Sequence, residues 1–236
     1  MLTGAILVVG SFSPRSMLDT PAFSAANCSS ETLGHIPISC LEILGKSTLD
    51  RTIERLQDAD IRPINVIAEK RFASVVATPA ARGTRLHLAP ASNALNSTAE
   101  CVLRDCVQQG IETVILIRLG SYAEFDLADL IRFHRDRGQE VTPVTDGQRP
   151  VSFWVIQHDR VRRNRFLGME ELLEEKSGSE VEAYRLPGYV NHFENASDVR
   201  RLVIDALGAR CAIRPSGREA KPGIWLGEGT QVHRHA

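Results

Sequence analysis

Residues 5–18, AILVVGSFSPRSML, decide the fold of this chain. The apolar run AILVV ends at Gly10, and a loop of small and polar residues that includes Arg15 follows it. A short apolar run closed by glycine is typical of a strand buried inside a parallel sheet. In open α/β sheets, ligands bind in the crevice outside the carboxyl ends of the strands. We therefore expect a parallel sheet with its ligand site in the loop after this strand.

Length and charge limit the class of protein. With 236 residues, 43% of them hydrophobic, the chain can form one large domain, or one domain with a small appendage. Its 28 Lys and Arg against 29 Asp and Glu leave a net charge of -1, so no overall field attracts nucleic acid or an anionic membrane. No apolar run approaches the roughly 18 residues of a membrane span, and no signal peptide is evident. We expect a cytoplasmic protein that binds neither membrane nor nucleic acid.

The cysteines give no sign of a disulfide framework or a metal site. There are five of them, an odd number, and no two have CxxC spacing. This usage fits a reducing compartment and excludes the usual zinc ribbons. We expect no protein-bound metal from these residues.

Helical and strand patterns alternate along the chain. Further buried strands are expected over residues 64–68, 113–117 and 151–157, and helices over 47–60, 97–109, 126–137, 168–176 and 195–207. Capping boxes at 47–50 and 97–100 are expected to start two of these helices. Strand and helix alternation at this spacing predicts βαβ units, a parallel sheet and right-handed crossovers.

Residues 70–96 have a weak pattern, although they contain the string GTRL at 83–86. No predicted strand ends directly before this string. We therefore expect no phosphate-binding loop there.

The last residues change character. Ala220, Leu226 and Val232 recur every six residues, which is typical of a left-handed parallel β-helix built from hexapeptides. A single coil cannot bury its own ends, because repeat coils depend on neighbours. We expect two parts, an α/β domain over 1–208 and the beginning of a β-helix over 209–236. The open end of that β-helix predicts association with another subunit.

Three segments resemble the sugar-1-phosphate nucleotidyltransferases, the NDP-sugar pyrophosphorylases that include mannose-1-phosphate guanylyltransferase. They are LEILGKSTLDRTIERLQDADI at 41–61, TVILIRLGSYAEFDLADLIRFHRDRGQEVT at 113–142 and LPGYVNHFENASDVRRLVIDAL at 186–207. The resemblance implies a Rossmann-like nucleotidyltransferase fold, a mostly parallel mixed sheet with helices on both faces. It also implies a reaction in which a sugar phosphate attacks the α-phosphorus of an NTP and pyrophosphate leaves.

The first loop keeps part of the family's phosphate-binding pattern. Aligned on the arginine of the family's GGxGTRL, the chain retains Gly10 and Arg15 but has Ser11 and Ser13 in place of glycines. Pro14 removes one backbone N–H donor. The resemblance makes Gly10, Ser11, Ser13 and Arg15 the candidate nucleotide-binding residues, with Arg15 the candidate catalytic cation.

The other family positions have lost their charge. The family's phosphate-facing lysine falls at Ile38, and its two metal-binding aspartates fall at Gly120 and His192. The loop with the family's EKP motif has no counterpart, because only a few residues separate Thr142 from the 151–157 strand. Mg²⁺ prefers oxygen ligands, so these positions predict no metal site. We expect a nucleotidyltransferase-like protein without catalysis that binds a nucleotide or NDP-sugar, or has a structural or regulatory role in nucleotide-sugar metabolism.

Two alternatives stay open. The first is an active sugar-1-phosphate nucleotidyltransferase with Mg²⁺ and an altered site that uses Arg15, His192 and Asp126. The second is an acyltransferase-like module formed by the hexapeptide tail, with His233 and His235 as its chemically active residues. Pyrophosphate release separates the first alternative from a binding protein.

Overall fold

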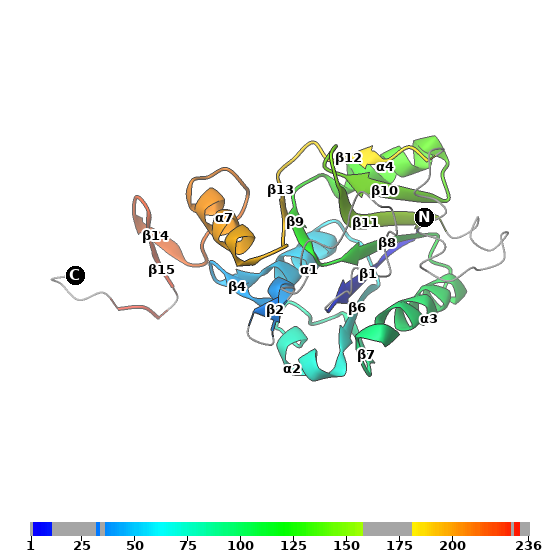
Figure 1. The fold of residues 1–236 in the computed structure, drawn as a ribbon, viewed down its shortest axis with the longest axis horizontal. Coiled ribbons are helices and arrows are strands. Elements are labelled where there is room, and N and C mark those ends of the chain that lie inside the picture. The colour runs from blue at the N-terminus through cyan, green and yellow to red at the C-terminus, as the bar shows by residue number, and fades with distance from the viewer. Residues whose placement is uncertain (1, 11–31, 34–35, 158–180, 228, 232–236) are drawn as a thin grey trace.

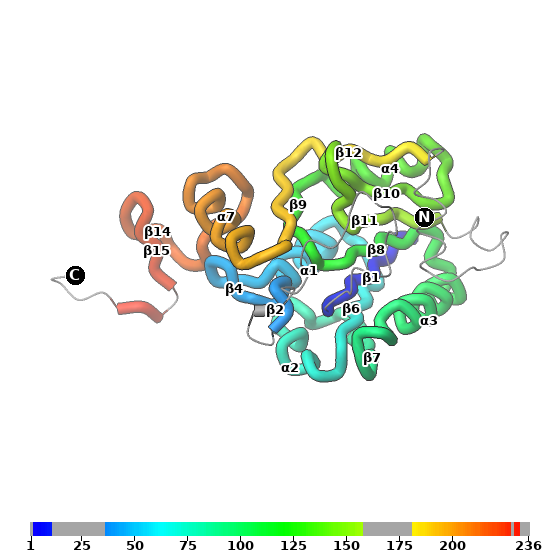
Figure 2. Tube along the Cα trace, viewed as in Figure 1, coloured from blue at the N-terminus to red at the C-terminus, as the bar shows by residue number. Residues whose placement is uncertain are grey.

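The computed structural model describes residues 2–10, 32–33, 36–157, 181–227 and 229–231 (Figures 1 and 2). The helices are α1 (Thr48–Asp58), α2 (Ala73–Val76), α3 (Leu95–Gln108), α4 (Leu127–Arg137) and α7 (Ala196–Leu207). The strands are β1 (Thr3–Val9), β2 (Thr32–Leu33), β3 (Ile36–Pro37), β4 (Glu42–Ile43), β5 (Lys46–Ser47), β6 (Ile64–Glu69), β7 (Arg85–Ala89), β8 (Thr113–Arg118), β9 (Ser121–Ala123), β10 (Val141–Thr145), β11 (Pro150–Gln157), β12 (Tyr184–Arg185), β13 (Val190–His192), β14 (Arg218–Lys221) and β15 (Ile224–Leu226). The helix expected over 168–176 lies outside the described residues.

Seven strands form one sheet, in the order β12-β10-β11-β8-β1-β6-β7 (Figure 1). The opening strand β1 lies between β6 and β8 and runs parallel to both. β11 runs antiparallel to its neighbours β8 and β10. The mostly parallel mixed sheet is therefore confirmed, and the strands expected at 64–68, 113–117 and 151–157 are β6, β8 and β11.

Helices cover both faces of this sheet. On β1, Leu7 packs in one core cluster with Ile53 of α1, whereas Val8 packs in another with Leu103 of α3. Burial of each such side chain stabilises the fold by about 1.5–3 kcal/mol. A strand buried on both faces must be apolar throughout, which explains the unbroken AILVV run.

Local capping signals fix most helix boundaries. Ser47 and Asp50 form the expected capping box of α1, and Asp126 caps α4 through the N–H groups of Ala128 and Asp129. Gly138 ends α4 in the left-handed conformation, at φ 60°. The expected start of α3 at Ser97 is wrong, because a 3₁₀ turn over Ser92–Ala94 leads directly into a helix that begins at Leu95.

A third core cluster joins distant parts of the chain beside the main sheet. It contains Ile38, Tyr122, Phe193, Leu202 and Ile213. The segment from β12 through β13 to α7, residues 184–195, lies along this cluster, and we call it the strap. Ile213 lies beyond residue 208, yet it is buried here.

The tail forms a hairpin. β14 pairs with β15 in antiparallel register, with Arg218 opposite Leu226, whereas the coils of a β-helix pair in parallel. A hairpin satisfies its backbone groups locally and needs no neighbouring coil. The expected β-helix is therefore not confirmed, and His233 and His235 lie outside the described residues.

Candidate functional site

The carboxyl ends of β1, β6 and β8 meet at one edge of the sheet. Gly10 directly follows β1, Glu69 ends β6 and Arg118 ends β8. The strand register places Val9 opposite Ala68 and Val8 opposite Arg118. Topology therefore brings the residues after the three strands to one place, as the opening stretch predicts.

A small hollow at this edge unites three of the sequence-predicted positions. Gly10, Ile38 and Gly120 line it together with Phe193 of the strap. Its volume is about 10 Å³, which is room for about one water molecule. The fold thus brings these positions to one small hollow.

Ile38 is a packing residue in this structure. It begins the 3₁₀ turn Ile38–Cys40 and is 3% exposed within the third core cluster. The Thr48 hydroxyl donates a hydrogen bond of 3.0 Å to the carbonyl of Ser39 and holds the turn against α1. An aliphatic side chain at this point supplies apolar contact and no charge for a phosphate.

Gly10 needs its glycine for reasons of space. A Cβ at this residue would lie 2.8 Å from Leu95 Cδ1 and 3.5 Å from Glu69 Oε1. The backbone therefore passes close to both the first turn of α3 and a buried carboxylate. Ser11, Ser13 and Arg15, the rest of the candidate nucleotide loop, lie outside the described residues.

His192 lies in β13 opposite Ser121, one residue after Gly120. Its Nε2 lies 2.9 Å from Asp146 Oδ2, and the other Asp146 oxygen accepts hydrogen bonds from the N–H groups of Gln148 and Arg149 at 2.8 and 2.7 Å. Burial acts to raise the pKa of Asp146, but these hydrogen bonds lower it to about 2. The pair holds the turn after β10 against the strap, and an ion pair between Arg149 and Glu194 joins the same two segments.

Sequence reasoning missed three charged residues at the carboxyl edge. Glu69 is 4% exposed and pairs with Arg71, with 2.9 Å between Glu69 Oε2 and Arg71 Nε. Arg118 is 3% exposed, donates to Asn96 Oδ1 at 3.0 Å and lies 5.6 Å from the Trp154 ring centre. Their position directly after the INVIA and TVILI runs is the signal that could have identified Glu69 and Arg118. The Arg71 guanidinium, with its side chain 59% exposed, is a cation that this edge offers to an anionic ligand.

The residues at the expected metal positions do not fit Mg²⁺. Gly120 has no side chain, and the ring nitrogen Nε2 of His192 is already bonded to Asp146. Asp126, which the altered-site alternative uses, is engaged as the cap of α4. Within the described ranges, no group of three or more His, Cys, Asp or Glu could hold a metal ion. We derive no catalytic step through a metal.

Solved structures of other proteins share this architecture. HddC from Yersinia pseudotuberculosis superimposes with a TM-score of 0.58 at 12% identity, over 87% of this chain and 99% of its own. A Bacillus anthracis protein described as a glucose-1-phosphate thymidylyltransferase, in complex with sucrose, gives 0.53 at 10% identity, over 86% of this chain and 94% of its own. The chain has a nucleotidyltransferase fold.

The chain resembles these proteins in structure and not in sequence. No protein-family model and no curated protein sequence matches the chain. HddC complexed with GMP-PN superimposes equally well, with a TM-score of 0.58. No helix in the described ranges has the length and apolarity of a membrane span. The nucleotidyltransferase fold therefore stands on architecture, and the chemistry has to be argued from the residues of the edge.

Proposed function

We propose that this chain is a nucleotidyltransferase-fold protein that binds a nucleotide or nucleotide-sugar at the carboxyl edge of its sheet without metal-dependent nucleotidyl transfer. Its role would be structural, regulatory or ligand-binding in nucleotide-sugar metabolism. The observation that carries the proposal is the hollow formed by Gly10, Ile38, Gly120 and Phe193. The positions converge, but they present apolar or absent side chains.

The chemistry of phosphoryl transfer explains why this replacement matters. Charge that develops on the transferring phosphoryl group has to be stabilised by cations and metal ions positioned in advance. Each lost contact of this kind costs on the order of 3–4 kcal/mol, and such losses multiply in rate. Ile38 and Gly120 supply none of this charge stabilisation.

Support for binding comes from the fold and from the cations of the edge. In open α/β sheets, ligands occupy the crevice beyond the carboxyl ends of the strands. Of the neighbours, HddC has been crystallised with GMP-PN. Arg15 in the loop after β1 and Arg71 after β6 are the residues that we propose to face the phosphates.

Titration calorimetry with GMP-PN and with GDP- and UDP-sugars tests the proposal, each in the presence of EDTA and of Mg²⁺. We expect binding that survives EDTA and weakens at least tenfold in Arg15→Ala. The matched control is Arg218→Ala, which removes an exposed arginine from β14 in the tail hairpin. Absence of binding to every one of these ligands would contradict the proposal.

An altered-site enzyme is the second candidate, favoured by the His192–Asp146 pair near Gly120. A histidine bonded to an ionised carboxylate is a common general base. In this candidate His192 and Arg15 act on bound nucleotide, with Mg²⁺ supplied by the solution. This candidate predicts that the chain releases pyrophosphate from an NTP only when a sugar 1-phosphate is present. Loss of that release in His192→Ala would establish the altered-site enzyme in place of the binding protein.

A further inference from the structure

The last strand of the sheet, β7, has an open outer side. It pairs in parallel with β6 on its inner side and ends the strand order of the sheet (Figure 1). Among the described residues, no strand pairs with its outer side. Exposed edge strands are templates for pairing with another chain, and proteins commonly protect them with lysine, proline or a covering element. β7 has neither lysine nor proline.

The two faces of β7 differ in chemistry. Leu86 and Leu88 are 41% and 43% exposed, and they lie opposite Val66 and Ala68, whose side chains face α1. The alternate residues Arg85 and His87 lie on the α3 face. A strand added beside β7 would therefore meet leucines on one face and basic side chains on the other.

A groove of about 360 Å³ opens beside Leu86. This volume falls within the range of ligand-binding clefts. Its lining combines apolar side chains with two threonines and one arginine, Arg82, and contains no acidic residue: Val66, Val76, Ala77, Thr78, Pro79, Ala81, Arg82, Thr84 and Leu86.

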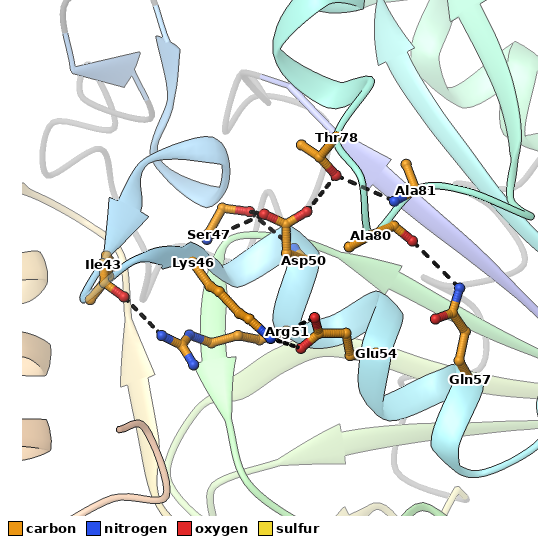
Figure 3. Close-up of polar contacts among 10 residues, drawn as sticks. All are labelled: Ile43, Lys46, Ser47, Asp50, Arg51, Glu54, Gln57, Thr78, Ala80 and Ala81. Carbon is orange, nitrogen blue, oxygen red and sulfur yellow. Dashed lines mark hydrogen bonds and ion pairs between the residues drawn. The ribbon is translucent and has the colours of Figure 1, made fainter. Parts of the chain in front are cut away.

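The outer wall of the groove is held in place by α1 (Figure 3). Thr78 donates a hydrogen bond of 2.5 Å to Asp50, and its hydroxyl accepts one from the N–H of Ala81 at 3.3 Å. Gln57 donates to the carbonyls of Ala80 and Arg82 at 3.4 Å each. The loop between α2 and β7 is therefore fixed before any ligand arrives, which lowers the entropic cost of binding.

Charge indicates which occupant fits. Arg82 lies in the groove, and Arg85 donates a hydrogen bond of 2.7 Å to the neutral Gln109. Pairing of β7 with β7 of a second copy would bring two Arg82 and two Arg85 side chains to one interface. Like charges at an interface oppose binding, whereas acidic side chains complement it.

We propose that β7 binds an extended segment of a partner protein in which apolar and acidic residues alternate. The segment adds a strand to the sheet, with its apolar side chains beside Leu86 and Leu88 and its acidic side chains toward Arg85 on the α3 face. Main-chain hydrogen bonds supply affinity in this mode, and alternate side chains supply specificity. The groove shares no lining residue with the hollow at Gly10.

Fluorescence anisotropy with two labelled synthetic peptides of equal length tests the proposal. One alternates valine and glutamate between serine ends, and the other alternates valine and lysine. We expect the glutamate peptide to bind at least tenfold more tightly to the full chain. Arg85→Glu should reverse this preference, and Leu86→Lys should weaken binding of the glutamate peptide at least tenfold.

The matched control is Leu207→Lys, which changes another exposed leucine, 59% exposed, on α7. It should leave binding of both peptides unchanged. Sedimentation of the chain alone supplies the second readout. Equal binding of the two peptides, no binding of either, or a dimer that Leu86→Lys dissociates would overturn the proposal, and a dimer would assign the edge to a second copy.

Discussion

Two hollows of the same sheet contrast sharply. The hollow at Gly10 lies where the topology of an α/β sheet places a ligand, yet its volume is about 10 Å³. The groove beside β7 shares none of its lining residues, and its volume is about 360 Å³. Ile38 and Phe193 line the first, whereas small residues such as Ala77 and Ala81 line the second.

The contrast separates two determinants of a binding site. Strand order determines where the residues after each strand converge, and it does so whatever those residues are. The volume and charge of the converging side chains then determine whether a phosphate can be held. At the carboxyl edge, the strand order still brings the residues together, but the volume and charge of their side chains do not suit a phosphate.

Removal of the Phe193 ring is expected to have the largest effect. Phe193 is 4% exposed in the third core cluster, so Phe193→Ala should lower the free energy of unfolding by about 3–5 kcal/mol. Urea denaturation measures this loss. Leu86→Ala at the β7 groove, where the side chain is 41% exposed, should change it by less than about 0.5 kcal/mol. Equal losses would remove the contrast between a filled and an open hollow.

A pair of glycines near the strap tests how tightly the carboxyl edge is packed. A Cβ at Gly188 would lie 1.9 Å from the carbonyl oxygen of Glu124, so Gly188→Ala should cost about 1–3 kcal/mol as the strap shifts. At Gly120 no atom lies within 4 Å of an added Cβ. Gly120→Ala should therefore be nearly neutral in the same denaturation experiment, and a large loss there would mean that the edge is tighter than the structure shows.

Asp50 tests whether the groove wall is held from α1. Asp50→Ala removes the capping box and the bond to Thr78, and it should cost about 1–2 kcal/mol. It should also speed amide hydrogen exchange over residues 78–84. Asp198→Ala breaks the equivalent capping box of α7 but leaves the groove untouched, so it is the matched control. Equal rates of amide exchange over residues 78–84 in both variants would show that Asp50 does not hold the groove wall in place.

The smallest expected effect concerns acid stability. Because the folded state lowers the pKa of Asp146 to about 2, below the usual value near 3.9, this carboxylate stabilises the fold above about pH 4. That contribution is lost as the pH falls from about 4 toward 2. Asp146→Asn should flatten the decline in unfolding free energy over this interval. An unchanged slope would show that the bond to His192 contributes nothing to stability.

Local signals in the sequence were sufficient for much of the fold. Asp126 and Gly138 mark the two ends of α4, and unbroken apolar runs mark β1 and β8. β7 escaped prediction because its leucines alternate with arginine and histidine on an exposed edge, so the run is not apolar on both faces. In the GTRL string, Gly83 and Thr84 form the turn into this strand, and Arg85 and Leu86 are its first two residues.

The site was less predictable than the fold. Gly10, Ile38 and Gly120, which motif order singles out, line one hollow. The partnership of His192 with Asp146 spans 46 residues and depends on how the strap crosses the turn after β10. No local pattern encodes such a contact. In the tail, the period of six residues did not determine strand pairing, because β14 and β15 pair in antiparallel register.

The third core cluster also has a consequence for synthesis of the chain. Ile38 and Ile43 leave the ribosome well before Leu202, Cys211 and Ile213 of the same cluster. The apolar surface around Ile38 therefore lacks these partners while the intervening residues are translated. Such waiting surfaces are where nascent chains aggregate or recruit chaperones. The order of translation thus makes the strap and α7 the elements that complete folding.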